Sequence, residues 1–160
     1  MAQYDVAIIG SGPGGYVSAI RCSQLGLKTA LIEKYQNLGG TCLNVGCIPS
    51  KSLLDSSHHY ENAVNDFSDH GIEIQGSIKV DLKKMISRKK AVVDQTISGI
   101  DFLMKKNNIS VYNGLGSFID STHINIQGEK NIIIEAKNTI IATGSKPSSL
   151  PFISLDKERI

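Results

Sequence analysis

The chain has 160 residues, of which 41% are hydrophobic and 20% are charged, values typical of a globular domain with its own core. A net charge of +2 is too small to indicate a nucleic-acid or an anionic-membrane partner. No apolar run approaches the roughly 20 residues of a membrane-spanning helix, and the pattern beginning at Met1 leaves no room for a signal peptide. We therefore expect a cytoplasmic protein without a membrane or nucleic-acid partner.

The first part of the chain predicts a strand, a tight turn, a helix and a second strand. Residues 3–9 form a β-rich apolar run that stops at Gly10. Residues 14–25 have apolar side chains at helical spacing, with Pro13 as a favourable start and Gly26 as a stop. Residues 27–33 predict the second strand. A β-α-β unit of this length predicts a parallel crossover.

The rest of the chain predicts two helices followed by a strand-rich last third. Helices are expected at 50–64 and at 80–106, where an apolar stripe faces lysines that we interpret as a solvated surface. The hydrophobic period then changes to two, which predicts short strands at 111–112, 117–119, 123–126, 132–135 and 139–142. Residues 145–151 have a linker-like composition. The pattern as a whole predicts an α/β fold.

A glycine-rich motif joins the first strand to the first helix. Residues 10–15, Gly10-Ser11-Gly12-Pro13-Gly14-Gly15, fit the G-x-G-x-x-G pattern of dinucleotide-binding turns. In that pattern the first glycine permits the turn, the second allows close approach of a pyrophosphate, and the third allows helix and strand to pack. Glu33 ends the second strand, where its carboxylate can accept hydrogen bonds from ribose hydroxyls. A structural turn without a ligand is the less favoured alternative, and the motif alone does not separate FAD from NAD.

Two cysteines form a candidate redox pair. Cys42 and Cys47 lie just before a predicted helix, and Pro49 places Cys47 at its N-terminus, where the helix dipole and free N–H groups stabilise a thiolate. Cys42, one loop away, is expected to be the exposed partner that attacks and releases a dithiol substrate through a mixed disulfide. We therefore expect redox chemistry at this pair.

Other roles for the cysteines are less favoured. A zinc site needs a second pair of ligands at matching spacing, which the four histidines do not supply, so no metal site is expected. Two inert buried thiols and a structural disulfide are the remaining alternatives. Cys22, within the first helical pattern, is interpreted as a core or helix-packing thiol.

These motifs resemble the flavoprotein disulfide reductases, a family of pyridine nucleotide-disulfide oxidoreductases, and within them the dihydrolipoamide dehydrogenase (E3) branch. The resemblance rests on residues 10–16, 19–27 and 39–51 (GGTCLNVGCIPSK) and covers nearly the whole chain. Glutathione-type reductases usually carry lysine in place of Ser50, and mercuric reductases usually carry valine in place of Ile48.

The resemblance implies a Rossmann-like FAD-binding domain: a parallel sheet with crossover helices plus an antiparallel β-meander, incomplete at its C-terminal end. It implies that residues 1–146 form this domain and that 147–160 lead toward a missing NAD-binding domain. It also implies that Cys47 contacts the flavin, that Cys42 faces the substrate and that Lys51 lies near the flavin ring. The cofactor-binding residues are then Gly10, Ser11, Gly12, Pro13, Gly14, Gly15, Glu33, Lys34, Gly39, Gly40, Thr41, Cys42, Lys51, Gly114, Gly116, Ala142, Thr143 and Gly144.

For the activity, the resemblance implies oxidation of dihydrolipoamide through a Cys42–Cys47 disulfide and FAD, with NAD⁺ as co-substrate. The implied partners are the lipoyl domain of 2-oxo acid dehydrogenase complexes and, for the full-length protein, a second subunit in a homodimer. None of the four histidines matches the family's catalytic histidine, so the fragment alone is expected to have little turnover. The alternatives are a nucleotide-binding module without turnover, or part of a glutathione-type or mercuric reductase.

Overall fold

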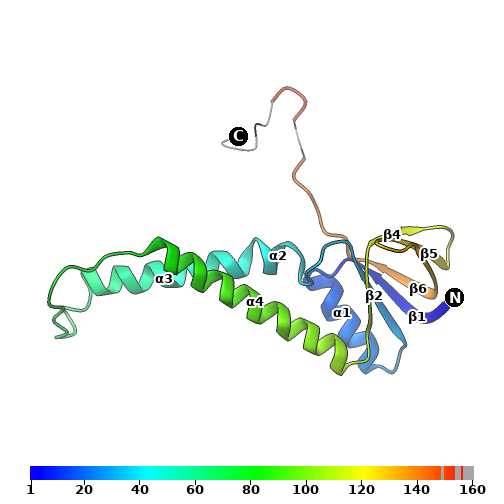
Figure 1. The fold of residues 1–160 in the computed structure, drawn as a ribbon, viewed down its shortest axis with the longest axis horizontal. Coiled ribbons are helices and arrows are strands. Elements are labelled where there is room, and N and C mark those ends of the chain that lie inside the picture. Colours follow the sequence, from blue (N-terminus) through cyan, green and yellow to red (C-terminus); the bar gives the residue numbers. More distant parts are fainter. Residues whose placement is uncertain (149, 154–155, 157–160) are drawn as a thin grey trace.

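The computed structural model describes residues 1–148, 150–153 and 156, which contain one six-stranded sheet and four helices (Figure 1). The strand order is β3-β2-β1-β6-β5-β4. The strands are β1 (Ala2–Ile9), β2 (Thr29–Glu33), β3 (Ser110–Asn113), β4 (Leu115–Phe118), β5 (His123–Gln127) and β6 (Ile132–Ile141). The helices are α1 (Pro13–Gln24), α2 (Gly40–Asn44), α3 (Cys47–Asn65) and α4 (Leu82–Lys106). The mixed α/β fold predicted from the sequence is confirmed.

The predicted parallel crossover is the centre of the sheet. β1 pairs in parallel with β2 on one side and with β6 on the other, and β2 pairs in parallel with β3. The connecting helix α1 begins at Pro13, whose fixed φ suits a first helical position. It ends before Gly26, which has a φ of +82° that favours glycine. The local signals in the sequence therefore identified both ends of this helix.

Side chains alternate between the two faces of the central strands and form two apolar clusters. Val6, Ile8 and Leu31 belong to the cluster that packs against α1 and α4. Ala7 and Ile32 belong to a second cluster shared with β5 and β6. Because residues 6–9 of β1 and 30–32 of β2 are buried on both faces, these stretches are apolar, as expected of a parallel sheet.

The sheet folds back on itself through a single glycine. β3 and β4 lie at opposite ends of the strand order, yet only Gly114 separates them in the chain. β4 therefore lies across the second apolar face, where a Cβ on Gly116 would come within 3.2 Å of the Ile32 side chain and 3.3 Å of that of Ile9. Antiparallel pairing of β4 with β5 and of β5 with β6 confirms the expected β-meander.

One strand prediction was wrong at β6. Strands were expected at 132–135 and 139–142, but one ten-residue strand spans both. The polar residues between them stay in the strand because β1 pairs along them, and Lys137 Nζ lies 2.7 Å from Asp5 Oδ1. β5 pairs only with 132–135, so within the described residues no strand pairs with the other side of 137–141. Thr139 Oγ1, in this stretch, is buried without a hydrogen-bond partner.

α3 and α4 run side by side away from the sheet as a long hairpin (Figure 1). Arg88 on α4 connects the two helices: its guanidinium donates to Ser52 O (3.1 Å), Ser56 Oγ (3.1 Å) and Asp55 Oδ2 (2.8 Å). Arg88 thus departs from the solvated basic face expected for this helix. Within the described part of the chain, no helix is both long enough and apolar enough to cross a membrane.

Candidate functional site

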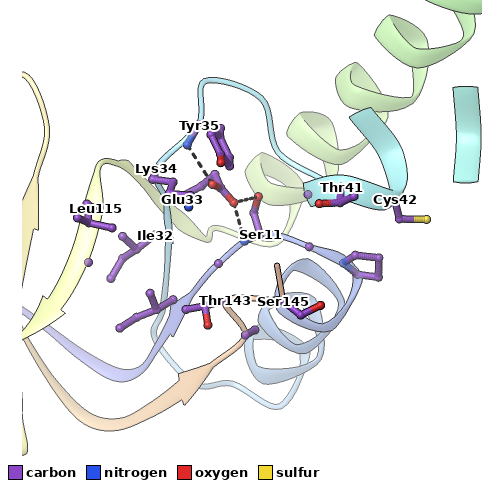
Figure 2. A pocket seen from close by; sticks show the side chains of 18 of the residues that line it. Ser11, Ile32, Glu33, Lys34, Tyr35, Thr41, Cys42, Leu115, Thr143 and Ser145 are labelled. Atoms are coloured by element: carbon purple, nitrogen blue, oxygen red, sulfur yellow. Dashed lines mark hydrogen bonds between the residues drawn. The ribbon is translucent and has the colours of Figure 1, made fainter. Parts of the chain in front are cut away.

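A cavity of about 440 Å³ opens where β1, β2 and β6 end at their carboxyl ends (Figure 2). This is the position at which open α/β sheets bind ligands. The lining residues come from the glycine loop, the end of β2, α2, the turn into β4 and the segment after β6. They are Ile9, Gly10, Ser11, Gly12, Pro13, Ile32, Glu33, Lys34, Tyr35, Gly40, Thr41, Cys42, Gly114, Leu115, Gly116, Ala142, Thr143, Gly144, Ser145 and Lys146.

The three motif glycines differ in what a side chain at each would meet. Gly10 has a φ of +100°, and a Cβ there would lie 2.3 Å from Ala142 O. A Cβ on Gly15 would lie 1.8 Å from Gly10 O, so this glycine allows α1 to pack against the end of β1. A Cβ on Gly12 would meet no atom within 4 Å. The open space beside Gly12 and the first-turn N–H groups of α1 suit a pyrophosphate.

Glu33 is a buried carboxylate held by three donors at the end of β2. Its Oε2 accepts hydrogen bonds from Ser11 N (2.9 Å) and Ser11 Oγ (2.6 Å), and its Oε1 accepts one from Tyr35 N (3.0 Å). Burial raises the pKa of the Glu33 carboxyl, but the hydrogen bonds from Ser11 and the backbone outweigh it, so the net pKa is lowered from 4.5. Since a carboxylate has about four acceptor positions, Glu33 retains capacity for a ligand hydroxyl.

The cysteine pair is connected differently from the loop that was expected. Cys42 lies inside the short helix α2, and Cys47 is the first residue of α3, as Pro49 had indicated. α2 comes close to the glycine loop because Gly40, with a φ of +61°, would place a Cβ only 2.6 Å from Gly12 Cα. The start of α2, the helix that contains Cys42, and the glycine loop are therefore in close backbone contact.

Both thiols are free and interact with each other. The pKa of the Cys42 thiol is raised, mainly by its hydrogen bond with the Cys47 thiol and then by burial. The expectation that Cys42 is the exposed partner was wrong: Cys42 is half-buried beside the cavity and Cys47 is exposed. The reason is the position of each residue. Cys42 lies within α2 against the cavity wall, whereas Cys47 is the first residue of α3, at the exposed N-terminal end of that helix.

Most of the predicted binding residues line the cavity, and four do not. Gly14 and Gly15 lie in α1 behind the loop, Gly39 donates its N–H to Ser11 O (3.0 Å), and Lys51 is exposed on α3. Gly116 lies within β4 and lines the cavity. Whether each of these residues contacts a cofactor stays a prediction.

Several cavity residues escaped the sequence reasoning. Their position in the chain could have identified them. Each lies at or next to the end of a strand whose carboxyl end meets the cavity, or lies next to a residue of a predicted motif. They are Ile9, Ile32, Tyr35, Leu115, Ser145 and Lys146. Lys34 Nζ lies 4.8 Å from the centre of the Tyr35 ring, so these two neighbours form a cation–π pair at the rim.

Cys22 and the four histidines lie outside the lining of the cavity. Cys22 is partly buried and packs against the cluster under α1 and α4. His58, His59 and His70 are exposed, and His123 Nδ1 lies 2.8 Å from Asp120 Oδ2 in the β4–β5 turn. In the described part of the chain, no group of three or more His, Cys, Asp or Glu side chains could hold a metal ion.

A family model described as pyridine nucleotide-disulphide oxidoreductase matches residues 4–159. The chain belongs to this family. Among relatives in the family, dihydrolipoyl dehydrogenase of Trypanosoma brucei brucei is 48% identical over 97% of this chain and 33% of its own length. Dihydrolipoyl dehydrogenase 1, mitochondrial, of Arabidopsis thaliana is 50% identical over 99% of this chain and 31% of its own length. Leghemoglobin reductase of Vigna unguiculata is 48% identical over 99% of this chain and 30% of its own length. The chain thus spans about a third of the length of these relatives.

Solved structures agree with this assignment. The HOCl-induced flavoprotein disulfide reductase of Escherichia coli, in its Cu(II) complex, has a TM-score of 0.74 and 29% identity, over 94% of this chain and 31% of its own. FAD is the cofactor that membership of the oxidoreductase family implies. The cavity fits it on three observations: the open space beside Gly12, the residual acceptor capacity of Glu33, and the continuity of the cavity from Glu33 to Cys42.

Proposed function

We propose that this chain is the FAD-binding and redox-disulfide part of a dihydrolipoyl dehydrogenase. The observation that carries the proposal is the interaction between the Cys42 and Cys47 thiols, with Cys42 in the lining of a cavity that a dinucleotide-type glycine loop also lines. Identities of 48% and 50% to two dihydrolipoyl dehydrogenases support this substrate branch. In the proposal, residues 1–146 form the FAD domain and 147–160 lead out of it. Positions 149, 154–155 and 157–160 of that segment lie outside the described residues.

The proposed reaction uses the cysteines as a two-electron relay. One thiolate of dihydrolipoamide attacks the Cys42 sulfur of a Cys42–Cys47 disulfide, and Cys47 leaves as a thiolate. The second substrate thiol then attacks the substrate sulfur bound to Cys42, which forms the lipoamide ring and releases Cys42. Because the pKa of Cys42 is raised, the released sulfur takes up a proton readily. FAD, when bound, supplies the acceptor of these two electrons and their transfer to NAD⁺.

The same proposal assigns the cofactor contacts. The backbone at Gly10, Gly12 and Gly40 would hold the pyrophosphate, since these positions line the cavity and have no side chain. Glu33 would accept a hydrogen bond from an adenosine ribose hydroxyl through its remaining acceptor position. Lys51, one turn beyond Cys47 on α3, would place a cation near the flavin ring.

The proposed partners are those of the whole protein. They are dihydrolipoamide carried by a lipoyl domain of a 2-oxo acid dehydrogenase complex, NAD⁺ and a second subunit in a homodimer. We propose a cytoplasmic location on the strength of the sequence alone. Because two relatives in Arabidopsis thaliana are named as mitochondrial, localisation of the tagged full-length protein is the measurement that decides it.

The test is flavin retention followed by dithiol reduction. The chain, purified with added FAD, is expected to remain yellow, and anaerobic dithiothreitol is expected to bleach the bound flavin. Cys42→Ser and Cys47→Ser are expected to keep the flavin and lose the dithiol-dependent bleaching. Cys22→Ser, which changes a thiol of the core, is the matched control and should behave as the unsubstituted chain does.

Two results would contradict the proposal. One is a well-folded chain that never retains flavin with FAD in excess, and the other is bleaching of Cys42→Ser at the unsubstituted rate. Steady-state assay of the chain with dihydrolipoamide and NAD⁺ is expected to give little turnover. The full-length protein, about three times as long by comparison with its relatives, is expected to turn over and to prefer dihydrolipoamide to glutathione and mercuric ion.

A further inference from the structure

Ser11 is a fully buried polar residue whose polar groups are all used inside the protein. Its N–H and its hydroxyl both donate to Glu33 Oε2, at 2.9 and 2.6 Å. Its carbonyl oxygen accepts from Gly39 N at 3.0 Å, and its hydroxyl oxygen accepts from the same N–H at 3.3 Å. The hydroxyl is therefore engaged by two protein segments, although Ser11 also belongs to the lining of the cavity.

The two segments that Ser11 joins are the two functional ends of the site. Glu33 is the one carboxylate among the described residues that line the cavity. Gly39 is the N-cap of α2, with a φ of +100°, and Cys42 follows in the same short helix. Figure 2 shows Ser11 beside Glu33, with Thr41 and Cys42 of α2 on the other side of it. The Ser11 side chain thus contacts both Glu33, the carboxylate proposed to bind the adenosine ribose, and the start of α2, the helix that contains Cys42.

The Ser11 hydroxyl acts as a hydrogen-bond donor toward Glu33 and as an acceptor toward Gly39. A buried carboxylate is costly unless it is hydrogen-bonded, and the Ser11 hydroxyl is one of its three donors. While that hydroxyl donates to Glu33, its lone pairs face the Gly39 N–H. A rotation of the hydroxyl or a shift of Glu33 therefore acts on the backbone from which α2 begins.

We propose that Ser11 is a positioning residue that couples the nucleotide end of the cavity to the cysteine pair. Its hydroxyl fixes the Glu33 carboxylate and the Gly39 turn together, and its proton is donated to Glu33 and not to the cofactor. Loss of the hydroxyl then changes both FAD affinity and the equilibrium between the dithiol and the disulfide. This inference rests on the proposed function, since it concerns how the FAD and redox parts of that site act on each other.

The experiment measures two quantities on the 160-residue chain. The first is the dissociation constant for FAD, from flavin fluorescence. The second is the equilibrium with glutathione, in which the Cys42 and Cys47 thiols lose two electrons and two protons and one glutathione disulfide becomes two glutathione thiols. It is measured without flavin by trapping free thiols. Ser11→Ala is expected to weaken FAD binding about tenfold, as for a hydrogen bond to a charged group. It is expected to shift the glutathione equilibrium about threefold or more.

Controls separate positioning from a general structural effect. Ser18→Ala removes a hydroxyl that bonds only to the α1 carbonyls Gly14 O and Gly15 O, and it is expected to leave both quantities unchanged. Glu33→Gln is expected to shift the glutathione equilibrium although Glu33 is not part of α2. In the double variant Ser11→Ala/Glu33→Gln, the two effects on FAD affinity are expected to be less than additive.

The outcomes are distinguishable. If the chain binds FAD and Ser11→Ala alters neither quantity, the inference is wrong and the proposed function stands. If the chain binds no FAD, the proposed function fails, and an unchanged glutathione equilibrium in Ser11→Ala also overturns the coupling to α2. Should Ser11→Ala not fold, the glutathione equilibrium of Glu33→Gln decides: a shift supports the coupling and no shift overturns it.

Discussion

Gly12 and Gly15 belong to the same motif, but a side chain at each would meet different surroundings. A Cβ on Gly12 has no atom within 4 Å, whereas one on Gly15 would lie 1.8 Å from a backbone oxygen. Gly12 therefore leaves open space beside the cavity, which we propose a ligand uses, whereas Gly15 is required by the fold. This distinction separates binding from stability in a single motif.

Gly12→Ala is expected to fold and to lose the cofactor. The change costs about 1 kcal/mol or less in unfolding free energy, the effect of alanine at an N-cap, while the methyl group occupies the space proposed for the pyrophosphate. Gly15→Ala is expected to lose about 3 kcal/mol or more through the clash with Gly10 O. Urea unfolding and flavin content of both variants check this. Equal loss of stability in the two variants would contradict it.

Glu33 gives the molecule a stability that depends on pH. Since its pKa is lowered in the folded state from 4.5, the folded carboxyl binds a proton less readily than the unfolded one. Its contribution is therefore fully present above pH 4.5 and is lost as the pH falls from there through the lower folded pKa. Burial opposes this direction, and the donors from Ser11 and the backbone reverse it.

Glu33→Gln is expected to flatten this part of the stability curve. The variant is less stable than the unsubstituted chain at pH 7, because an amide cannot accept all three donors as a carboxylate does, and the difference shrinks as the pH falls below 4.5. Urea unfolding between pH 3 and 7 measures both curves. A difference that stays constant over this window would refute the assignment.

The sequence predicted the backbone geometry of these residues better than their exposure. The glycine motif and the position of Cys47 at a helix start follow from local rules of backbone geometry, and the structure confirms both. The burial of Cys42 did not follow, because it depends on the close approach of Gly40 to Gly12. That approach is a tertiary contact between segments far apart in the sequence.

Among the elements, the α3–α4 hairpin depends on few specific contacts between its helices. Arg88 is the clearest of these, with donors to Ser52, Asp55 and Ser56 on successive turns of α3. Since α3 begins with Cys47, the hairpin also orients one of the two reactive thiols. The lysine-rich pattern of α4 concealed this role, because charge spacing alone does not distinguish a solvated residue from an interhelical one.

Arg88→Ala is expected to loosen the hairpin without unfolding the sheet. The loss is about 1 kcal/mol, because the Arg88 and Asp55 side chains are 48% and 52% exposed and solvent screens such pairs. Hydrogen exchange is expected to accelerate at α3 amides and to stay unchanged in β1 and β2. Lys90→Ala, an exposed cation on the same helix, is the control. Equal acceleration in the two variants would show that Arg88 has no special role.

For the helices and strands, segment length and hydrophobic periodicity predicted the long elements and failed on the short ones. α4 was expected at 80–106 and spans Leu82–Lys106, because a sustained apolar stripe is a strong signal. α2 was missed since five residues are too few for a periodic pattern. β6 was divided in two because Lys137 and Asn138 interrupt its apolar residues, although pairing with β1 continues through them.

At the scale of the whole molecule, the α/β fold and the family were both predictable from the sequence. What the sequence did not reveal is how the antiparallel strands fold back over one face of the sheet. The single residue Gly114 connects strands at opposite ends of the strand order, so the meander covers one face while α1 and α4 cover the other. This arrangement leaves the carboxyl ends of the central strands open, which is where the cavity lies.

The unpaired side of β6 has a consequence for handling the isolated chain. Residues 137–141 present backbone donors and acceptors that, within the described residues, no neighbouring strand satisfies, and Ile141 at the end of this stretch is 66% exposed. Such an edge is a template for strand addition by another chain. Concentrated solutions of the 160-residue chain are therefore prone to self-association and precipitation, and a charged substitution at Ile141 is a rational way to improve its solubility.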